Sequence, residues 1–229
     1  MRSTRNKLVI FGVSNILSDI FDAALANHLL PSKVVLNQPE VCGERDLPLA
    51  GRIQALAGHC PLPLIQQLDE FEPADDELYV LGPTTPAREA LAALLKATFG
   101  LEFHSLIHPT ACVSPLATLG QGVFVGANSV IAAGVHCDDH VFINRGVTIG
   151  HDNRLGAYTR VQPGANLGGL SRIGRGVMIG LGATLMERLH IGDGAVIGGG
   201  AVVLADVPAQ VLVVGIPAKI RKNLVTEAS

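Results

Sequence analysis

Aliphatic residues recur at every sixth position through the second half of the chain, from Ile107 to Val203. Of the seventeen positions in this register, sixteen are Leu, Ile or Val, and the remaining one is the small, apolar Cys137. A Gly directly follows nine of the seventeen. A period of six fits neither a helix of 3.6 residues per turn nor an alternating strand. It is typical of a prism of short parallel strands, with one hexad per face and three faces per turn.

We therefore predict an all-β, left-handed parallel β-helix of hexapeptide repeats for this part of the chain. The aliphatic residue of each hexad is expected to point inward, together with the mostly small residue four positions later. A Gly after the aliphatic residue would let the backbone bend where a side chain would clash. Seventeen hexads amount to between five and six coils, about 25 Å tall at about 4.8 Å between strands.

The first part of the chain shows a different pattern. Buried strands are predicted over 7–12, 33–37 and 77–82, and helices over 16–29 and 86–99. Alternating strands and helices imply a small parallel sheet, so this part is predicted to be a Rossmann-like α/β domain.

Glycine marks the boundary between the two parts. Six glycines precede residue 107, nineteen lie between 107 and 207, and one follows. We place an α/β domain in 1–103 and the β-helix with its C-terminal tail in 104–229.

Small ligands in parallel sheets bind beyond the carboxyl ends of the strands. That rim carries Gly12, Ser14, Asn37, Gln38, Gly82 and Arg88. The segment FGVSN has one glycine where a dinucleotide fingerprint needs three, which disfavours NAD. The rim is therefore interpreted as a small-molecule or nucleotide site, with a ligand-free tight turn as the alternative.

Composition narrows the choice of partners. The 229 residues are 48% hydrophobic and 16% charged, with 17 Lys and Arg against 20 Asp and Glu. A net charge of -3 offers no surplus for a nucleic-acid backbone. No apolar run has the length of a membrane helix, and the apolar run near the N-terminus is too short for a signal peptide. Four scattered cysteines without a CxxC pair indicate reduced thiols in a cytoplasmic protein.

Three segments carry a resemblance to a known family: IHPTACVSPLATLGQGV (107–123), FINRGVTIGHD (142–152) and VVGIPAK (213–219). With the preceding α/β domain, the chain resembles the bacterial sugar O/N-acetyltransferases of the hexapeptide-repeat superfamily. These include sialic acid O-acetyltransferases and bacillosamine-type N-acetyltransferases that act on nucleotide-linked amino sugars. The resemblance implies acetyl-CoA as donor, no metal, and a homotrimer with active sites between neighbouring prisms. It also implies that the first domain binds the acceptor.

Acetyl transfer needs a base, a hydrogen-bond donor to the oxyanion, and residues that bind the coenzyme. His151 lies near a predicted prism corner and can reach a groove, so it is a candidate base. In the family the matching histidine is the general base, and the acid that follows, here Asp152, raises its basicity. Neighbouring side chains in a strand diverge, which leaves the role of Asp152 open. Gly169 stacks one coil above His151, and in the family this glycine amide faces the thioester oxygen; a corner glycine needed only for bending is the alternative.

Further site residues follow from the resemblance. Leu181 and Gly199 match the coenzyme channel, and Asn144 matches an acceptor-side asparagine, or else is a structural turn residue. Lys219 follows the last coil and is placed at the coenzyme phosphates, with a solvated basic run as the alternative. Many family members have a second histidine where this chain has Arg160, which can pair with a coenzyme phosphate or carbonyl but cannot act as a base.

The expected function is acetyl-CoA-dependent transfer to the amino group of a nucleotide-linked amino sugar in cell-surface glycan synthesis. O-acetylation of a sugar or other metabolite and a non-catalytic trimeric scaffold are the alternatives. The first domain departs from the family: its turn is GVSNIL, and Asn37-Gln38 replaces the usual acidic pair. A zinc site of the γ-carbonic anhydrase type would need His136, His140 and His151 on one face, and their hexad phases differ.

Overall fold

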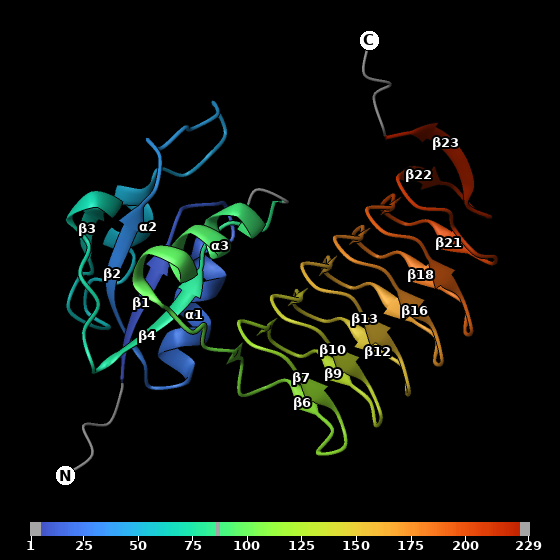
Figure 1. The fold of residues 1–229 in the computed structure, drawn as a ribbon, viewed down its shortest axis with the longest axis horizontal. Coiled ribbons are helices and arrows are strands. Elements are labelled where there is room, and N and C mark those ends of the chain that lie inside the picture. The colour runs from blue at the N-terminus through green and yellow to red at the C-terminus, as the bar shows by residue number, and fades with distance from the viewer. Residues whose placement is uncertain (1–5, 86–87, 225–229) are drawn as a thin grey trace. The chain divides into compact units, whose positions relative to one another are not determined.

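The computed structural model describes residues 6–85 and 88–224, and the chain divides into two compact units, Met1–Leu106 and Ile107–Ser229. Figure 1 shows a small α/β unit followed by a long series of coils. The division falls after Leu106, a few residues beyond the boundary drawn from the glycine distribution.

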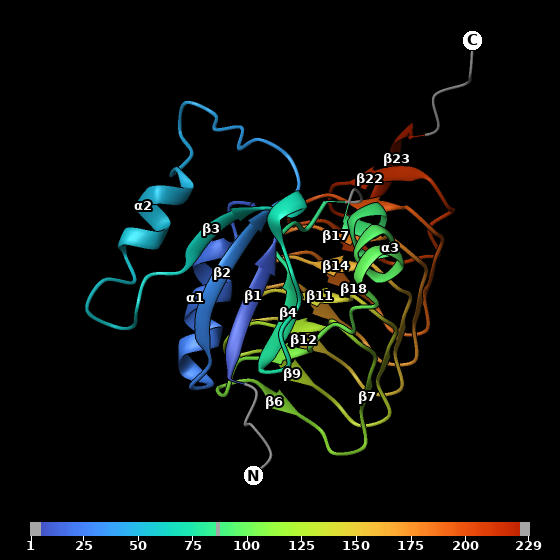
Figure 2. The same cartoon turned by 60° about the vertical axis from the view of Figure 1, so that its left-hand side comes forward.

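The first unit is built on a parallel sheet of four strands in the order β3-β2-β1-β4. The strands are β1 (Lys7–Phe11), β2 (Leu30–Leu36), β3 (Leu64–Gln67) and β4 (Glu77–Leu81). All residues of β1 after Lys7 are buried, as expected for a central strand with both faces covered. The helices α1 (Leu17–Ala26) and α3 (Arg88–Phe99) lie on different sides of the sheet (Figure 2). The predicted small parallel sheet is thus confirmed.

Several boundaries differ from the expectations. The sequence pattern missed β3, the short helix α2 (Leu49–Gln54) and a 3₁₀ turn at Leu68–Glu70, because each is too short to give a clear periodic signal. The predicted first helix ends early, since His28 adopts a left-handed conformation with φ 57°. Pro86, predicted to open the last helix, lies outside the described residues.

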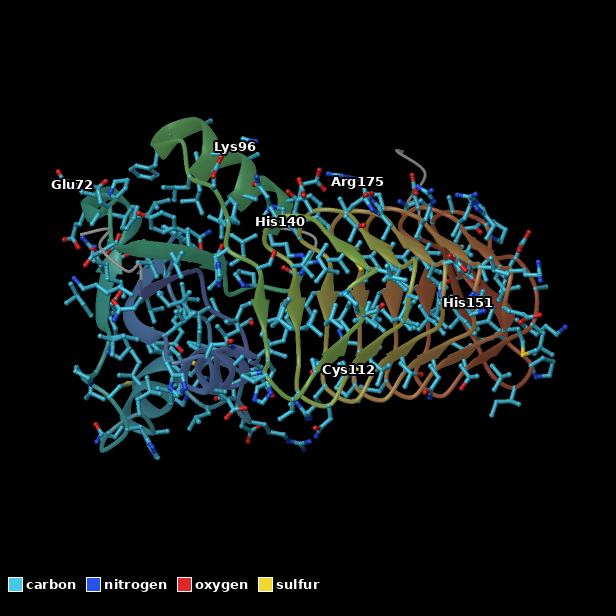
Figure 3. The ribbon with its side chains drawn as sticks, turned by 90° about the horizontal axis from the view of Figure 1, so that it is seen from below. Glu72, Lys96, Cys112, His140, His151 and Arg175 are labelled. Atoms are coloured by element: carbon cyan, nitrogen blue, oxygen red, sulfur yellow. The ribbon has the colours of Figure 1, made fainter. Side chains whose placement is uncertain are left out.

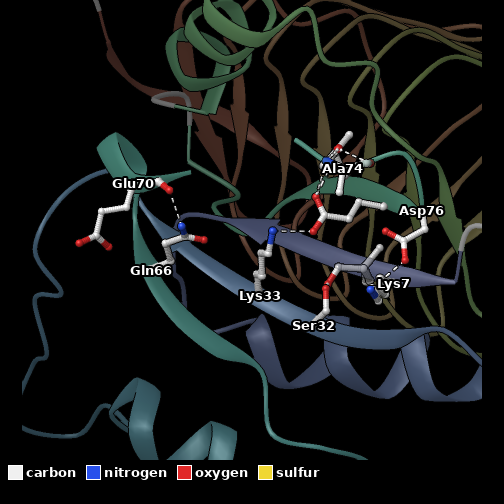
Figure 4. Close-up of polar contacts among 10 residues, drawn as sticks. Lys7, Ser32, Lys33, Gln66, Glu70, Ala74 and Asp76 are labelled. Carbon is white, nitrogen blue, oxygen red and sulfur yellow. Dashed lines mark hydrogen bonds and ion pairs between the residues drawn. The ribbon is translucent and has the colours of Figure 1, made fainter. Parts of the chain in front are cut away.

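Polar side-chain contacts link the strands of this sheet (Figure 4). The Nζ atom of Lys33 on β2 lies 2.7 Å from Oε1 of Glu77 on β4, whose side chain is only 3% exposed. Lys7 pairs with Asp76 at 2.8 Å. Because β1 lies between β2 and β4, the Lys33–Glu77 pair crosses the central strand and holds the sheet together.

The second unit is a prism with three parallel sheets as its faces (Figure 1). One face contains β6 (Cys112–Val113), β9 (Val130–Ile131), β12 (Thr148–Ile149), β15 (Asn166–Leu167), β18 (Thr184–Leu185) and β21 (Val202–Val203). The next contains β7 (Thr118–Leu119), β10 (His136–Cys137), β13 (Arg154–Leu155), β16 (Arg172–Ile173) and β19 (His190–Ile191). The third contains β5 (Leu106–Ile107), β8 (Phe124–Val125), β11 (Phe142–Ile143), β14 (Arg160–Val161), β17 (Met178–Ile179), β20 (Val196–Ile197), β22 (Val211–Val214) and the antiparallel β23 (Lys219–Asn223). The fold is the predicted left-handed parallel β-helix.

The hexad rule accounts for the core of this unit. Fourteen of the seventeen aliphatic positions, from Val125 onward, are buried. The remaining three belong to the first coil, whose strands end their sheets, and they are half-buried against the same core. The residues four positions later also point inward, including the polar Ser129, Asn153, Thr159 and Ser171.

The glycines after the aliphatic positions are needed for a reason other than the expected bend. A Cβ at Gly126 would lie 2.7 Å from the backbone nitrogen of Arg145 in the next coil, and one at Gly156 would lie 2.7 Å from that of Arg175. The left-handed φ angles of the turns occur two residues later, for example at Gly146 and Asp152. Gly therefore permits close approach of successive coils, while the third residue of the turn makes the bend.

Candidate functional site

A histidine and an aspartate meet in the turn between β12 and β13. The Nδ1 atom of His151 lies 2.7 Å from Oδ2 of Asp152, and both side chains are more than half exposed. Figure 3 labels His151 among the coils of the β-helix. Asp152 has a φ of 58°, a left-handed conformation that turns its side chain back toward its neighbour. This conformation explains why two adjacent side chains converge here, although they would diverge in a strand.

The contact with the carboxylate assigns a proton to Nδ1 of His151, because a carboxylate only accepts hydrogen bonds. In the neutral ring, Nε2 then carries the lone pair. An imidazole nitrogen that is exposed and held in one tautomer is suited to proton transfer.

Gly169 lies one coil above this ring, in the turn after β15. A Cβ at Gly169 would lie 2.8 Å from Nε2 and 3.0 Å from Cδ2 of His151, so any side chain there would collide with the imidazole. The backbone N–H of Leu170 donates to the carbonyl of His151 at 2.8 Å and holds the two turns together. Within the described part of the chain, the N–H of Gly169 donates no hydrogen bond. The corner thus combines an imidazole nitrogen that can accept a proton with an adjacent backbone donor.

The predicted rim of the first unit is also assembled. A Cβ at Gly12, whose φ is 75°, would lie 2.8 Å from Cγ of Pro83 and 3.1 Å from Oδ1 of Asn37. Ser14 donates through Oγ to the carbonyl of Gly82 at 2.7 Å. These residues follow β1, β2 and β4, so the strand ends converge as expected. Arg88, also expected at this rim, is 3% exposed in the first turn of α3.

Gln38 lines two cavities of the first unit. One, of about 160 Å³, is bordered by Ser14 and Arg52; the other, of about 610 Å³, by Asn37 and Phe71. The larger cavity has the size of a small-molecule pocket. Both lie beyond the strand ends, where a ligand was expected.

The sequence interpretation missed a network that shapes the smaller cavity. Arg52 on α2 is 8% exposed and donates to Oδ1 of Asn15 at 2.7 Å, to the carbonyl of Leu47 at 3.0 Å and to Oγ of Ser18 at 3.0 Å. Asn15 donates onward to Asp46 at 2.7 Å. No periodic pattern signals such a network, because its members come from two helices, a turn and a loop that are separated along the chain.

The remaining histidines do not gather at this corner. His136 lies on the outer face of β10, 3.0 Å from Asp138, and the buried His140 stacks on Tyr158 with centroids 4.9 Å apart. Within 6–85 and 88–224, no three His, Cys, Asp or Glu side chains form a group that could hold a metal ion. In the same ranges, no helix combines the length and apolar character needed to cross a membrane.

Comparison with solved structures finds proteins that are similar to this chain over almost its whole length. The acetyltransferase domain of PglB from Neisseria gonorrhoeae FA1090 superposes with a TM-score of 0.78 at 28% identity, covering 94% of this chain and 99% of that one. Its complex with acetyl coenzyme A gives the same score at 29% identity and the same coverage. PerB from Caulobacter crescentus, solved with CoA and GDP-perosamine, also scores 0.78 at 26% identity, covering 94% and 97%. No protein-family model and no curated protein matches the chain.

In fold and in sequence the chain is therefore similar, over almost its whole length, to known acetyltransferases. Two of the residues expected at the coenzyme, Leu181 and Gly199, lie on a different edge of the prism from His151. Leu181 is 62% exposed in the turn after β17, and Gly199 stacks on it after β20. Those turns lead from the face of β17 to the face of β18, whereas His151 and Gly169 lie between the faces of β12 and β13. One prism therefore does not bring the two sets together.

Three further residues that were expected at the site are Asn144, Arg160 and Lys219. Asn144 shares the edge of Leu181, is 4% exposed, and accepts the N–H of Arg145 through Oδ1 at 2.8 Å, as a structural turn residue would. Arg160 is half-buried on β14, and this burial lowers the pKa of its guanidinium. Lys219 is exposed at the start of β23.

Proposed function

We propose that this chain transfers the acetyl group of acetyl-CoA to the amino group of a nucleotide-linked amino sugar. The observation that carries the proposal is the corner where the His151–Asp152 pair meets the open Gly169 amide. The family and its acetyl-CoA-bound member support the donor, and PerB, solved with GDP-perosamine, supports the acceptor class.

The corner can perform each step with its own groups. As the acceptor nitrogen attacks the thioester carbon and the C–N bond forms, Nε2 of His151 accepts the proton of the amine. Asp152 holds Nδ1–H and stabilises the imidazolium that results. The Gly169 N–H donates to the carbonyl oxygen while it carries negative charge. His151 then returns the proton to the sulfur as the C–S bond breaks, so the coenzyme leaves as a neutral thiol.

The coenzyme channel is part of the proposal. Leu181 and Gly199 lie on a different edge from His151, so we assign them, with Arg160 and Lys219, to a channel completed by a second prism. A homotrimer supplies such a pairing at each of its three interfaces.

The first unit is proposed to bind the nucleotide part of the acceptor. Gly12, Ser14, Asn37, Gln38 and Gly82 surround the strand ends, and the adjoining cavities offer polar and apolar walls. Asn37 and Gln38 present amides rather than carboxylates, so they can both donate to and accept from a base or ribose. We place the reaction in the cytoplasm, where the free cysteines of the chain stay reduced.

Calorimetric titration with acetyl-CoA tests the donor. We expect about one site per chain, in a species that sediments as a trimer. Absence of binding, or an active monomer, would contradict the channel. A panel of UDP-, GDP- and dTDP-linked amino sugars and their hydroxyl counterparts then tests the acceptor. Acetylation of the hydroxyl sugars alone would replace N-transfer with O-transfer.

A further inference from the structure

Asn153 is a fully buried amide directly behind the proposed reaction centre. It follows Asp152 and its side chain points into the prism, with 0% exposure. Its Nδ2 donates to two carbonyls, those of Gly150 at 2.7 Å and Gly168 at 2.8 Å. Its Oδ1 accepts the N–H of Ser171 at 2.9 Å. One side chain thus ties the turn that carries His151 to the turn that carries Gly169.

The two carbonyls belong to the peptide units that matter most for the reaction. The carbonyl of Gly168 and the N–H of Gly169 share one planar trans peptide, in which C=O and N–H point in opposite directions. Because Asn153 holds that carbonyl toward the interior, the Gly169 N–H must point outward. The carbonyl of Gly150 and the N–H of His151 share the neighbouring peptide in the same way. A hydrogen bond to the carbonyl also polarises the N–H at the other end of the unit.

The other turns show that the fold does not require this arrangement. Where the inward residue is apolar, the carbonyl that corresponds to that of Gly150 accepts a hydrogen bond from a backbone N–H instead. Examples are the N–H of Ala183 to the carbonyl of Gly180 at 3.2 Å and the N–H of Ala201 to the carbonyl of Gly198 at 3.2 Å. In the column of Asn153 itself, Val135 and Leu189 occupy the same inward position and are buried.

Two hydroxyl residues at equivalent positions each donate to one carbonyl of the next coil. Thr159 donates to the carbonyl of Gly174 at 2.7 Å, and Ser129 to that of Asn144 at 2.7 Å. Both reach the next coil, as Asn153 does when it bonds to Gly168. A Thr in place of Asn153 could therefore keep the contact to the carbonyl of Gly168.

We propose that Asn153 is a positioning residue that aims the Gly169 N–H at the developing oxyanion and orients the His151 turn beside it. This inference rests on the proposed acetyl transfer at the His151 corner. It assigns Asn153 an effect on turnover that exceeds its effect on folding.

The decisive comparison is Asn153→Val against Asn153→Thr, two side chains of nearly the same shape. Each is measured with acetyl-CoA and GDP-perosamine, or as acetyl-CoA hydrolysis if that sugar is not acetylated. Removing an oxyanion donor outright costs about 10²–10³ in kcat, so misdirecting one in Asn153→Val should lower kcat about 10- to 100-fold. The Kd for acetyl-CoA should stay nearly constant. Asn153→Thr should recover most of kcat.

Thr159→Val is the matched structural control, because it removes a buried hydrogen bond of the same kind at a turn away from His151. Its melting temperature should fall, while kcat stays within about twofold of the wild type. Should Asn153→Val not accumulate as folded protein, Asn153→Ala supplies the measurement, since Ala165 and Ala183 occupy equivalent buried positions.

His151→Ala separates failure of this inference from failure of the proposed function. If His151→Ala is inactive but Asn153→Val turns over at the wild-type rate, Asn153 is only structural and the inference is overturned. Equal kcat losses in Asn153→Val and Thr159→Val would overturn it as well. Retained turnover in His151→Ala would instead overturn the proposed function on which the inference rests.

Discussion

The two units of this protein place their candidate residues by different means. In the β-helix, residues eighteen apart are stacked by the parallel register, so Gly169 lies over His151 whatever the surface residues are. In the α/β unit, the rim depends on loops and a buried network around Arg52, whose members are far apart in sequence. In a repeat, the residues that stack on one another can therefore be predicted from their spacing in the sequence. In a rim formed by loops, the contacting residues can be identified only from the folded structure.

The largest effect should come from removing the proposed base in the β-helix. A positioned base contributes about 10²–10⁴-fold in rate, so His151→Ala should lower kcat at least 100-fold. Acetyl-CoA affinity, measured by calorimetry, should remain nearly intact because the side chain is not assigned to coenzyme binding. A kcat close to wild type would show that the stacked corner of the β-helix does not supply the base.

Gly169→Ala should come next. Its Cβ would lie 2.8 Å from Nε2 of His151, so the imidazole must move and kcat should fall about 100-fold, comparable to the loss of an oxyanion donor. Gly176→Ala is the matched control: it lies in another turn, where nothing lies within 4 Å of a Cβ. It should lose stability through its left-handed φ of 65° but retain kcat. Equal kcat in both variants would contradict the role of Gly169.

Asp152→Asn should have a smaller effect. It keeps the shape but no longer selects one tautomer of His151, so kcat should fall about tenfold, a part of the contribution of a positioned base. Asp138→Asn breaks the similar pair with His136, which lies 3.0 Å from Asp138 on another face. Steady-state kinetics should show no change in that control. A similar loss of kcat in both variants would mean that these His–Asp pairs affect kcat by stabilising the fold.

Gly12→Ala tests the rim of the first unit. Its Cβ would lie 2.8 Å from Pro83, so the strand end should shift and KM for the acceptor should rise several-fold, with kcat little changed. We expect it to cost about 1–3 kcal/mol of stability. Gly58→Ala has a similar φ of 85° with nothing within 4 Å of the Cβ, so it should lose stability without raising KM. Steady-state kinetics and thermal unfolding of the two variants separate strain from binding.

The smallest effect concerns pH and the loop around Asp46. The N–H of Gly43 and the amide of Asn15 donate to this carboxylate and hold its pKa below the ordinary 3.8. A depressed pKa means that the stabilisation is present above the ordinary pKa and is lost as pH falls through the folded-state value. Unfolding midpoints of the wild type and Asp46→Asn should therefore differ slightly at pH 7 and converge in acid. Parallel curves would show that the loop does not depend on this charge.

Individual residues show how far the sequence alone could go. The β-helix, its inward positions and the stacking of Gly169 on His151 follow from a period that no insertion interrupts. Whether Asp152 turns toward His151 did not follow, because it depends on the left-handed φ of one turn residue. The inward position of Asn153 could be read from its hexad, but not that its amide bonds to carbonyls of two coils.

In the first unit, three of the four strands and the rim residues after β1, β2 and β4 could be predicted from apolar runs that end in Gly or Asn. The α2 helix, β3 and the Arg52 network could not, since the two elements are too short for a periodic signal and the network uses long-range polar contacts. What the sequence by itself determined is whatever repeats along the chain, because identical local preferences summed over many hexads specify one register. What only the tertiary structure decided is the direction of single side chains at turns and loops, where one φ angle or one distant partner sets the geometry.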